Sequence, residues 1–397
     1  MQFAQRLTTI ANNVFADMDG AKALARASGI EIIDLSLGSS DLPAEPSAIA
    51  AIKEALDDSS THGYLLFNNT QRFRKAVANW YSSKFGLEVD PETEVLQLIG
   101  SQEGTAHLPL AILNPGDVAL LQDPGYPSHA GGVYLAGGQI YPMPLLAEHQ
   151  FLPVLADIPT SVLTAAKMMV LSYPHNPTAA IAPLEFFQQA VAFCRQHQLI
   201  LVHDFPYVDL VFTESNSTAI APSILQADPE KELSVEFFTM SKSYNMGGFR
   251  VGYAIGNPKI IKALRQIKAV IDFNQYQGIL NGAIAALSGS QDSVNKTVAK
   301  FRQRRDVFVE ALRNIGWQVT SPPATMYIWG KLPEPWQDRS VEFCTQLVAK
   351  TGVAASPGAG FGKSGEGYVR FALVREPEIL QLAATKIAEF QKFRIRN

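Results

Sequence analysis

Thr239-Met-Ser-Lys-Ser-Tyr-Asn-Met-Gly-Gly-Phe-Arg-Val-Gly252 is the stretch of this chain around which its other motifs can be placed. The mainly apolar residues just before it are typical of the end of a buried strand. Within the stretch, Lys242 lies among the hydroxyl residues Thr239, Ser241 and Ser243, and Arg250 follows a glycine pair. Hydroxyls, backbone amides and a guanidinium can hold a phosphate, and a lysine kept near cations and away from water can form a Schiff base. A solvated loop is the plain alternative.

The composition indicates a well-packed protein, and the length of the chain indicates more than one hydrophobic core. The chain has 397 residues, of which 47% are hydrophobic and 18% charged, so disorder is excluded as a global description. A net charge of −4 gives no electrostatic case for nucleic acid or anionic membrane. No run approaches the length of a membrane span, and the N-terminus lacks a secretory signal, which favours the cytoplasm. The two cysteines, Cys194 and Cys344, are expected to be reduced packing residues.

From about residue 95, short apolar runs alternate with helical segments. The runs that predict strands are residues 95–99, 118–122, 168–172, 199–203 and 251–255. Continuous apolar strands separated by helices indicate a mostly parallel sheet covered on both faces. In such sheets ligands bind outside the carboxyl ends of the strands, so the polar motifs after these strands should meet at one edge.

The two ends of the chain follow a different pattern. Helical spacing over residues 3–29 predicts an N-terminal arm, and the C-terminal part predicts two helices and a terminal helix around strands at 317–320, 326–329 and 368–373. This predicts a separate α+β lobe with which the N-terminal arm packs. The predicted segments are 1–45 (N-terminal arm and part of the small domain), 46–285 (large α/β domain) and 286–397 (small α+β domain).

Residues 241–252, Ser-Lys-Ser-Tyr-Asn-Met-Gly-Gly-Phe-Arg-Val-Gly, resemble the lysine motif of the fold-type I pyridoxal 5'-phosphate (PLP) aminotransferases of class I and II. The resemblance implies an α/β fold with a large PLP-binding domain and a smaller α+β domain. It also implies that Lys242 carries PLP as an internal aldimine, and that Thr239, Ser241 and Arg250 hold the cofactor phosphate. The matching motifs occur in family order from Gly38 to the last strand.

A carboxylate at the end of a buried strand needs a partner, and Asp204 follows such a strand. From the residues alone, a structural cap or ion pair is as plausible as a catalytic role. The resemblance implies that Asp204 keeps the pyridine nitrogen of PLP protonated, and that Tyr207 and Asn176 hydrogen-bond the ring 3'-oxygen. The family usually has Asn-Pro-Thr-Gly where this chain has Asn-Pro-Thr-Ala179, which leaves the shape of that turn open.

Gly100-Ser-Gln-Glu-Gly104 precedes a predicted helix, and the free amides of a helix N-terminus can bind an anion. A plain connection is the alternative. The resemblance implies that Ser101 and Gln102 contribute to the phosphate site. It also implies that Tyr126, in Asp123-Pro-Gly-Tyr-Pro127, stacks on the cofactor ring; alone it would be a turn tyrosine.

The resemblance implies three further contacts around the substrate. Arg370, on a predicted strand, clamps the substrate α-carboxylate, whereas a surface arginine is the alternative. Gly38 lies with its backbone against the same carboxylate. Tyr64 reaches the phosphate of the neighbouring subunit, which implies a homodimer with shared active sites. After this tyrosine the family commonly has two prolines that are missing from Tyr64-Leu-Leu-Phe-Asn-Asn69.

Two other patterns carry no site. Residues 360–365 fit G-x-G-x-x-G, but the strand after them excludes the helix that a nucleotide-binding loop requires. The seven histidines have no spacing that suits zinc, so no metal site is predicted.

The predicted reaction is PLP-dependent transamination between an amino acid and a 2-oxo acid, both small molecules. Several segments resemble LL-diaminopimelate aminotransferases and their alanine and aspartate relatives, with 2-oxoglutarate as the expected acceptor. They include Asn114-Pro-Gly-Asp117, Asp123-Pro-Gly-Tyr-Pro127 and Ala324-Thr-Met-Tyr-Ile-Trp329. A PLP-dependent lyase that breaks C–S bonds and a non-catalytic PLP-fold binding protein remain as alternatives.

Overall fold

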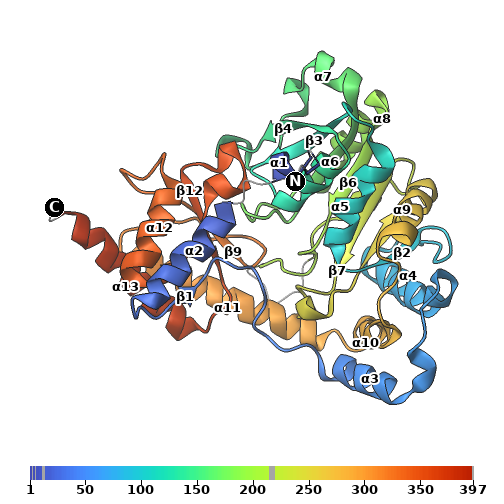
Figure 1. The fold of residues 1–397 in the computed structure, drawn as a ribbon, viewed down its shortest axis with the longest axis horizontal. Coiled ribbons are helices and arrows are strands. Elements are labelled where there is room, and N and C mark those ends of the chain that lie inside the picture. Colours follow the sequence, from blue (N-terminus) through green and yellow to red (C-terminus); the bar gives the residue numbers. More distant parts are fainter. Residues whose placement is uncertain (2, 5, 11–13, 214–219, 396–397) are drawn as a thin grey trace.

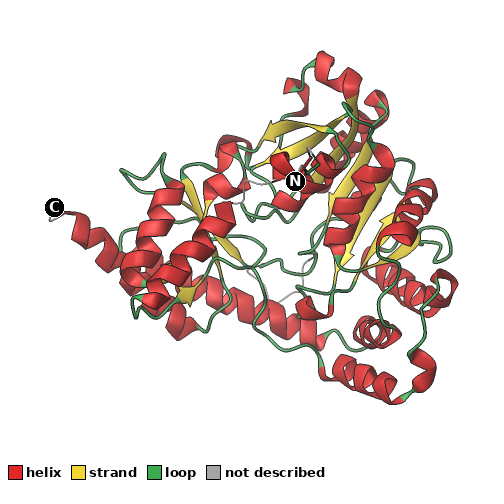
Figure 2. Cartoon of the chain, viewed as in Figure 1, coloured by secondary structure: helices red, strands yellow, loops and turns green. Residues whose placement is uncertain are grey.

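The structure, a computed structural model, describes residues 1, 3–4, 6–10, 14–213 and 220–395 of the chain. Figure 1 shows a large part built around a long sheet and a smaller part in which N-terminal and C-terminal elements lie together. In Figure 2 the yellow strands of the large part lie between red helices. This confirms the predicted α/β fold, with a large and mostly parallel sheet and a smaller α+β domain built from both chain ends.

The seven strands of the large sheet have the order β2-β8-β7-β6-β5-β3-β4. They are β2 (Val95–Leu98), β3 (Val118–Asp123), β4 (Gln139–Pro144), β5 (Ala166–Ser172), β6 (Ile200–Asp204), β7 (Ser234–Thr239) and β8 (Gly252–Gly256). β8 pairs antiparallel with β7 and β2, and the other neighbours pair parallel. Within this sheet, β8 therefore runs against the other strands.

The helices of the large domain have these bounds: α3 (Pro46–Asp57), α4 (Gln71–Phe85), α5 (Ser101–Ile112), α6 (Pro127–Leu135), α7 (Thr160–Ala165), α8 (Leu184–His197), α9 (Pro258–Ile271) and α10 (Gln277–Ser288). α10 packs against α3 and α4, so it belongs to the large domain by its contacts. The predicted boundary between residues 285 and 286 falls within α10, close to its end. The three predicted segments stay a prediction.

Both faces of the sheet are apolar, which explains the continuous apolar runs in the sequence. In β5, Met168 and Val170 belong to the core on one face, whereas Met169 and Leu171 belong to the core on the other. Helices α5, α6 and α9 cover the first face, and α4 and α8 pack on the second. Because helices cover both faces, polar side chains gather at the ends of the strands.

The small domain joins the two ends of the chain. Its elements are α2 (Val14–Ala27), β1 (Ile33–Asp34), α11 (Asp292–Asn314), β9 (Tyr327–Lys331), α12 (Ser340–Thr351), β10 (Val353–Ala354), β11 (Ser356–Pro357), β12 (Tyr368–Ala372) and α13 (Pro377–Ile395). β12 lies between β11 and β9 in an antiparallel sheet. β1 pairs parallel with β10, and α2 packs on α12.

A buried arginine fixes these two ends to each other. Arg304 of α11 is fully buried, and its guanidinium donates to both carboxylate oxygens of Asp41 at 2.6 and 2.8 Å. It also donates to Glu376 Oε1 at 2.9 Å and to the Leu373 carbonyl at 3.3 Å. The N-terminal segment, the long helix α11 and the start of α13 therefore share one cation.

Two local features of the structure concern the predicted N-terminal helical arm and the predicted strand at residues 317–320. The predicted N-terminal helical arm contains α1 (Arg6–Ile10) and α2, and residues 11–13 between them lie outside the description. Residues 317–320 do not form the predicted strand; the Val319 carbonyl accepts hydrogen bonds from the Arg313 guanidinium instead, at 2.9 and 3.1 Å. None of the described helices is both long and apolar enough to cross a membrane.

Candidate active site

The candidate site lies where β3, β5, β6 and β7 end. Asp204 is the last residue of β6, and Thr239 is the last residue of β7. Tyr126 and Asn176 lie just beyond the ends of β3 and β5. Parallel strands end at the same edge of a sheet, so these residues meet there although they are far apart in sequence. Two elements of the small domain, the turn after β1 and the β9–β12 pair, face this edge through the contacts described next.

Lys242 is held between the two domains. Its Nζ donates to the Gly38 carbonyl at 2.6 Å, and the same ammonium lies 5.6 Å from the centroid of the Tyr207 ring. The lysine is only partly buried. Gly38 has no room for a side chain, because a Cβ atom there would overlap the hydroxyl group of Tyr327.

Two phenols form the centre of the cluster. The hydroxyl groups of Tyr207 and Tyr327 are 2.9 Å apart, and both side chains are buried. Burial raises the pKa of Tyr207 well above its usual value. Burial alone would also raise the pKa of Tyr327, but the positive charges of Lys242 and Arg370 lower it. The two phenols are therefore electrostatically unequal.

Arg370 points into the site and not to solvent. Only 6% of the residue is exposed, and its ring contacts place the guanidinium 4.2 Å from the Tyr327 centroid and 4.7 Å from the Phe361 centroid. Nη1 donates to Asn176 Oδ1 at 2.8 Å, and Nη2 donates to the Ser36 carbonyl at 2.7 Å. Nε is buried without a hydrogen-bond partner among the described residues. The guanidinium is thus fixed in place with a donor to spare.

Asp204 has one oxygen paired and one unpaired. Oδ2 lies 3.0 Å from His129 Nε2, at the start of α6. Oδ1 is buried and has no hydrogen-bond partner among the described residues. The Tyr126 ring contacts the His129 ring at a centroid distance of 5.7 Å. A buried carboxylate oxygen without a partner is costly, so it is suited to a ligand that donates a hydrogen bond.

A second group of donors suits an anion. The Thr239 hydroxyl donates to Ser241 Oγ at 2.8 Å, and Ser241 Oγ also accepts from Arg250 Nη1 at 3.4 Å. The Arg250 guanidinium packs against Gly100, where a Cβ atom would overlap it. Ser101 begins α5 directly after this glycine, so the first amides of the helix lie beside the guanidinium and the hydroxyls.

Two of the predicted site residues do not join these contacts. Gln102 lies exposed in the first turn of α5, next to Ser101. Tyr64 is 91% exposed, and the ring contact described for it is with Phe273 at 6.5 Å. A role for Tyr64 therefore requires a second subunit, as the resemblance implies. The other predicted residues all take part in the contacts above or lie directly beside them.

The turn after Asn176 forms despite its alanine. Ala179 is buried and adopts a left-handed conformation, with φ of 63°. Its N–H donates to the His175 carbonyl at 2.8 Å, and the His175 N–H donates to the Ala180 carbonyl at 2.8 Å. The alanine accepts a conformation that glycine adopts more readily, at a cost of about 1–2 kcal/mol.

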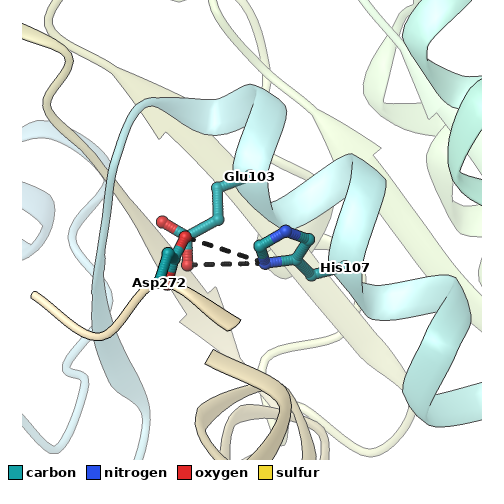
Figure 3. Close-up of side chains that lie close together, drawn as sticks. All are labelled: Glu103, His107 and Asp272. Carbon is teal, nitrogen blue, oxygen red and sulfur yellow. Dashed lines mark ion pairs between the residues drawn. The ribbon is translucent and has the colours of Figure 1, made fainter. Parts of the chain in front are cut away.

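A buried ionic cluster supports the start of α5. Glu103, His107 and Asp272 lie close together in Figure 3, and each could offer a metal ligand. Lys268 already lies among these oxygens, because its Nζ donates to both oxygens of Glu103 at 2.9 Å and to Asp272 Oδ1 at 3.1 Å. Burial raises the pKa of Glu103 to about 7, although Lys268 opposes this shift. An ammonium at this position disfavours a second cation.

Lys268→Met should destabilise the large domain by about 3–5 kcal/mol, because it leaves Glu103 buried without its ammonium partner. Lys268 is 0% exposed, so water cannot replace the lost contact. Glu103 Oε2 also accepts the Ile99 N–H at 2.5 Å, directly before the turn into α5. Loss of the Lys268 ion pair should therefore also make the predicted phosphate site at the start of α5 less rigid. Equilibrium unfolding in urea measures the change.

The matched control for this variant is the double substitution Glu103→Gln with Lys268→Met. It removes both charges, so it should recover most of the stability that the single substitution loses. Equal destabilisation by the single and the double variant would show that the ion pair is not the cause.

Sequence patterns alone missed three residues of the site: His129, Tyr327 and Phe361. His129 follows Tyr126 by one helical turn, which is a weak signal that could have been noticed. Tyr327 and Phe361 reach Arg370 from β9 and from the loop before β12, and these contacts depend on strand register that one sequence does not reveal.

The loop that contains the G-x-G-x-x-G pattern is part of the wall of the site. The Ser364 N–H donates to Asp123 at the end of β3, at 3.1 and 3.2 Å to the two carboxylate oxygens. The Phe361 carbonyl accepts the Gly125 N–H at 2.8 Å. These bonds tie the loop to the segment that carries Tyr126 and place the Phe361 ring against Arg370.

The residues present fit PLP on chemical grounds. The unpaired Asp204 oxygen could accept a pyridinium N–H, and the phenol of Tyr207 could meet a ring oxygen. The group of Thr239, Ser241, Arg250 and the helix N-terminus could hold a phosphate. An amine, a carboxylate and an anion site therefore occur together in a single cluster.

Comparison with known proteins identifies the family. The family model described as aminotransferase class I and II matches residues 30–387. An LL-diaminopimelate aminotransferase of Dehalococcoides mccartyi is 43% identical over 391 residues, which cover 98% of this chain and 99% of that protein. The corresponding enzyme of Halothermothrix orenii is 40% identical over 387 residues, with 98% of each chain covered.

A solved structure agrees with this result. A probable N-succinyldiaminopimelate aminotransferase from Thermus thermophilus superposes with a TM-score of 0.89 at 43% identity, covering 95% of this chain and 99% of that one. The sheet and its strand-end site thus define the fold of a PLP-dependent transferase. The chain belongs to the aminotransferase class I and II family, and it is an enzyme, an aminotransferase.

Proposed function

We propose that this aminotransferase uses PLP bound to Lys242 to exchange the amino group of a diaminopimelate-type amino acid with a 2-oxo acid. The observation that carries the proposal is the joint placement of a half-buried lysine, a buried carboxylate with a free oxygen and a buried arginine around one strand edge. Each of these groups suits one part of the reaction, as follows.

PLP, when bound, supplies an electron-accepting ring that stabilises charge next to the substrate amino group. Asp204 would hold a proton on the ring nitrogen through its unpaired oxygen, while His129 contacts its other oxygen. Tyr207 and Asn176 would bond the ring oxygen, and Tyr126 would lie against the ring. The phosphate would be held by Thr239, Ser241, Ser101 and Arg250, with Gln102 in the adjoining first turn of α5.

Lys242 moves the substrate proton. Its amine is half-buried and within 2.6 Å of the Gly38 carbonyl, so a short side-chain motion brings it to a substrate held between the domains. With PLP bound and the substrate in place, the freed amine of Lys242 would take the proton from the substrate Cα atom and hold it for its return. Gly38 and Arg370 hold the substrate carboxylate during the transfer.

Arg370→Ala should raise KM for every amino donor by about 10²-fold, because two charge-assisted hydrogen bonds to the common α-carboxylate are lost. Asn176 and the Ser36 carbonyl already hold the guanidinium in one orientation. The increase in KM should therefore reflect the loss of its fixed, planar set of N–H donors as well as the loss of its charge. Steady-state kinetics with several donors measures it. Arg370→Lys is the matched control: it keeps the charge but loses the fork, and should recover only part of the loss.

A KM increase confined to one donor would contradict this assignment. Arg370 would then belong to the side-chain pocket and not to the carboxylate clamp.

The substrate class is supported by the relatives. Two proteins named LL-diaminopimelate aminotransferases match almost the full length of the chain at 40–43% identity. N-succinyldiaminopimelate is a second candidate donor, because the Thermus protein named as a probable aminotransferase for it is also 43% identical to this chain. We propose 2-oxoglutarate as the acceptor, as the partner expected of the diaminopimelate, alanine and aspartate types.

A spectroscopic donor panel tests the proposal. The protein loaded with PLP should be yellow, lose that colour with its amino donor and recover it with 2-oxoglutarate. The donors are LL-diaminopimelate, N-succinyl-LL-diaminopimelate, alanine, aspartate and glutamate. Release of ammonia and pyruvate without any 2-oxo acid would identify a lyase instead. A protein that takes up no PLP would overturn the role of Lys242.

We further propose a homodimer in which Tyr64 completes the phosphate site of the neighbouring subunit. Tyr64 is 91% exposed, and Leu66, Val270 and Ile271 are also exposed apolar side chains. Asn274 donates to the Leu65 carbonyl at 2.8 Å, so the Tyr64 turn and the segment after α9 lie side by side. Apolar exposure of this kind marks association surfaces. Sedimentation of the purified protein distinguishes dimer from monomer.

A further inference from the structure

We infer that Tyr327 is a positioning residue that connects the two halves of the active site, the phenol of Tyr207 on the cofactor side and the guanidinium of Arg370 on the carboxylate side. The inference rests on the proposed function, because it assigns a task to Tyr327 within that reaction. The motif Ala324-Thr-Met-Tyr-Ile-Trp329 contains this tyrosine, but the motif alone gives it no role.

Tyr327 is placed for this task by the small domain. It begins β9, and it pairs with Ala372 on β12, two residues from Arg370. Side chains two apart on a strand, and those directly opposite on an antiparallel neighbour, share one face of the sheet. Tyr327 and Arg370 therefore project together toward the edge of the large sheet.

Its ring and its hydroxyl group make different contacts. The ring lies under the Arg370 guanidinium at 4.2 Å from the centroid, a cation–π distance. The hydroxyl lies 2.9 Å from that of Tyr207, which comes from the large domain. It also occupies the space that a side chain at Gly38 would need. One residue thus contacts both domains and the backbone beside Lys242.

The direction of the hydrogen bond follows from the donors available. A phenol has one proton, and in the proposed function Tyr207 donates its proton to the ring oxygen of PLP. Tyr207 then accepts from Tyr327, and a hydrogen bond received by a hydroxyl makes that hydroxyl a stronger donor. The charged or titratable groups that face Tyr327 are Tyr207, Lys242, Arg370 and Tyr126.

Removing the hydroxyl alone should therefore weaken the bond from Tyr207 to the cofactor. The ring oxygen then becomes more basic, and the cofactor on Lys242 keeps its proton to higher pH. The loss of this proton changes the visible absorbance of the bound cofactor. In Tyr327→Phe the pH midpoint of that change should rise by about 0.5–1 unit. KM for amino donors should change little, because the phenylalanine ring still lies under Arg370.

Removing the aromatic ring as well should reveal the separate effect of the contact between the Tyr327 ring and the Arg370 guanidinium. Tyr327→Leu should show the same shift of the midpoint and, in addition, raise KM for all donors by roughly three- to tenfold. If this variant does not fold, the phenylalanine variant still decides the hydroxyl contact. Tyr368→Phe is the matched control: Tyr368 lies on β12 and stacks on Trp329, and its substitution should move neither value.

A cofactor-free measurement adds an independent readout. In the apoprotein the Tyr327 phenol, with its lowered pKa, should ionise at lower pH than an ordinary tyrosine, seen as an ultraviolet difference signal. This early signal should disappear in Tyr327→Phe and persist in Tyr368→Phe. Its persistence in Tyr327→Phe would contradict the placement of Tyr327 between the two cations.

The outcomes separate this inference from the proposed function. A wild-type protein without a visible cofactor band would remove the proposed function and this inference with it. A wild-type band whose midpoint is unmoved in Tyr327→Phe would overturn the inference alone. The connecting role would be established by two results together: an upward shift of the midpoint at unchanged KM in Tyr327→Phe, and the same shift with a higher KM in Tyr327→Leu.

Discussion

Lys242→Ala should lower kcat by at least about 10⁴-fold, because it removes the amine that in the proposed function both carries the cofactor and moves the substrate proton. The contacts of Lys242, the Gly38 carbonyl at 2.6 Å and the Tyr207 ring, are made by its terminal amine. The side chain is only half-buried, so the fold should persist. Turnover with the donor found in the spectroscopic panel measures the loss.

Two variants control this result. Lys242→Arg keeps a positive charge at the same position but cannot form a Schiff base, so it should lose as much activity as the alanine variant. Lys259→Ala changes an exposed lysine at the start of α9 and should leave kcat unaltered. Activity near that of the wild type in either Lys242 variant would refute the mechanism.

Asp204→Asn should lower kcat by at least about 10³-fold while PLP still binds, because the charge that stabilises the protonated ring nitrogen is lost. Asparagine has nearly the same shape, and its side chain can still reach His129, which lies 3.0 Å from Asp204 Oδ2. The measurement is kcat at saturating donor together with PLP content per subunit. Loss of PLP along with activity would instead indicate a role in cofactor retention.

Asp228→Asn is the matched control for the carboxylate. Asp228 is buried like Asp204, but its oxygens accept the backbone N–H groups of Glu232, Leu233 and Ser234 away from the site. Its substitution should reduce stability and leave kcat per folded protein unchanged. Near-normal turnover in Asp204→Asn would contradict the proposed action on the ring.

The large sheet was predictable because its strands are apolar on both faces and end in polar residues. Asp204 illustrates this: a carboxylate directly after four mostly apolar residues marks a strand end and a site edge. The same logic failed at residues 317–320, where an apolar pattern gives no paired strand because Arg313 takes the Val319 carbonyl. The alternation of apolar and polar residues along a chain indicates which side chains are buried, but not which backbone groups form hydrogen bonds with one another.

The site was predictable in part, for a similar reason. Lys242 and Arg250 lie in one continuous motif, so a single stretch of sequence identifies both. Tyr327 acts through contacts with Tyr207 and Arg370, which lie 120 residues before it and on another strand. Such contacts depend on strand register and domain packing, and no local pattern encodes them.

The buried Arg304 has a consequence for how the protein forms during translation. Its guanidinium bonds Asp41, which is made before α11, and Glu376, which is made after it. A nascent chain that has just exposed α11 therefore has only one of the two carboxylate partners of Arg304, because the segment with Glu376 is made later. The large domain can fold first, whereas the small domain can close only once the segment that carries Glu376 has been made. The N-terminal part of the small domain should thus stay accessible to proteases and chaperones until that segment has been made.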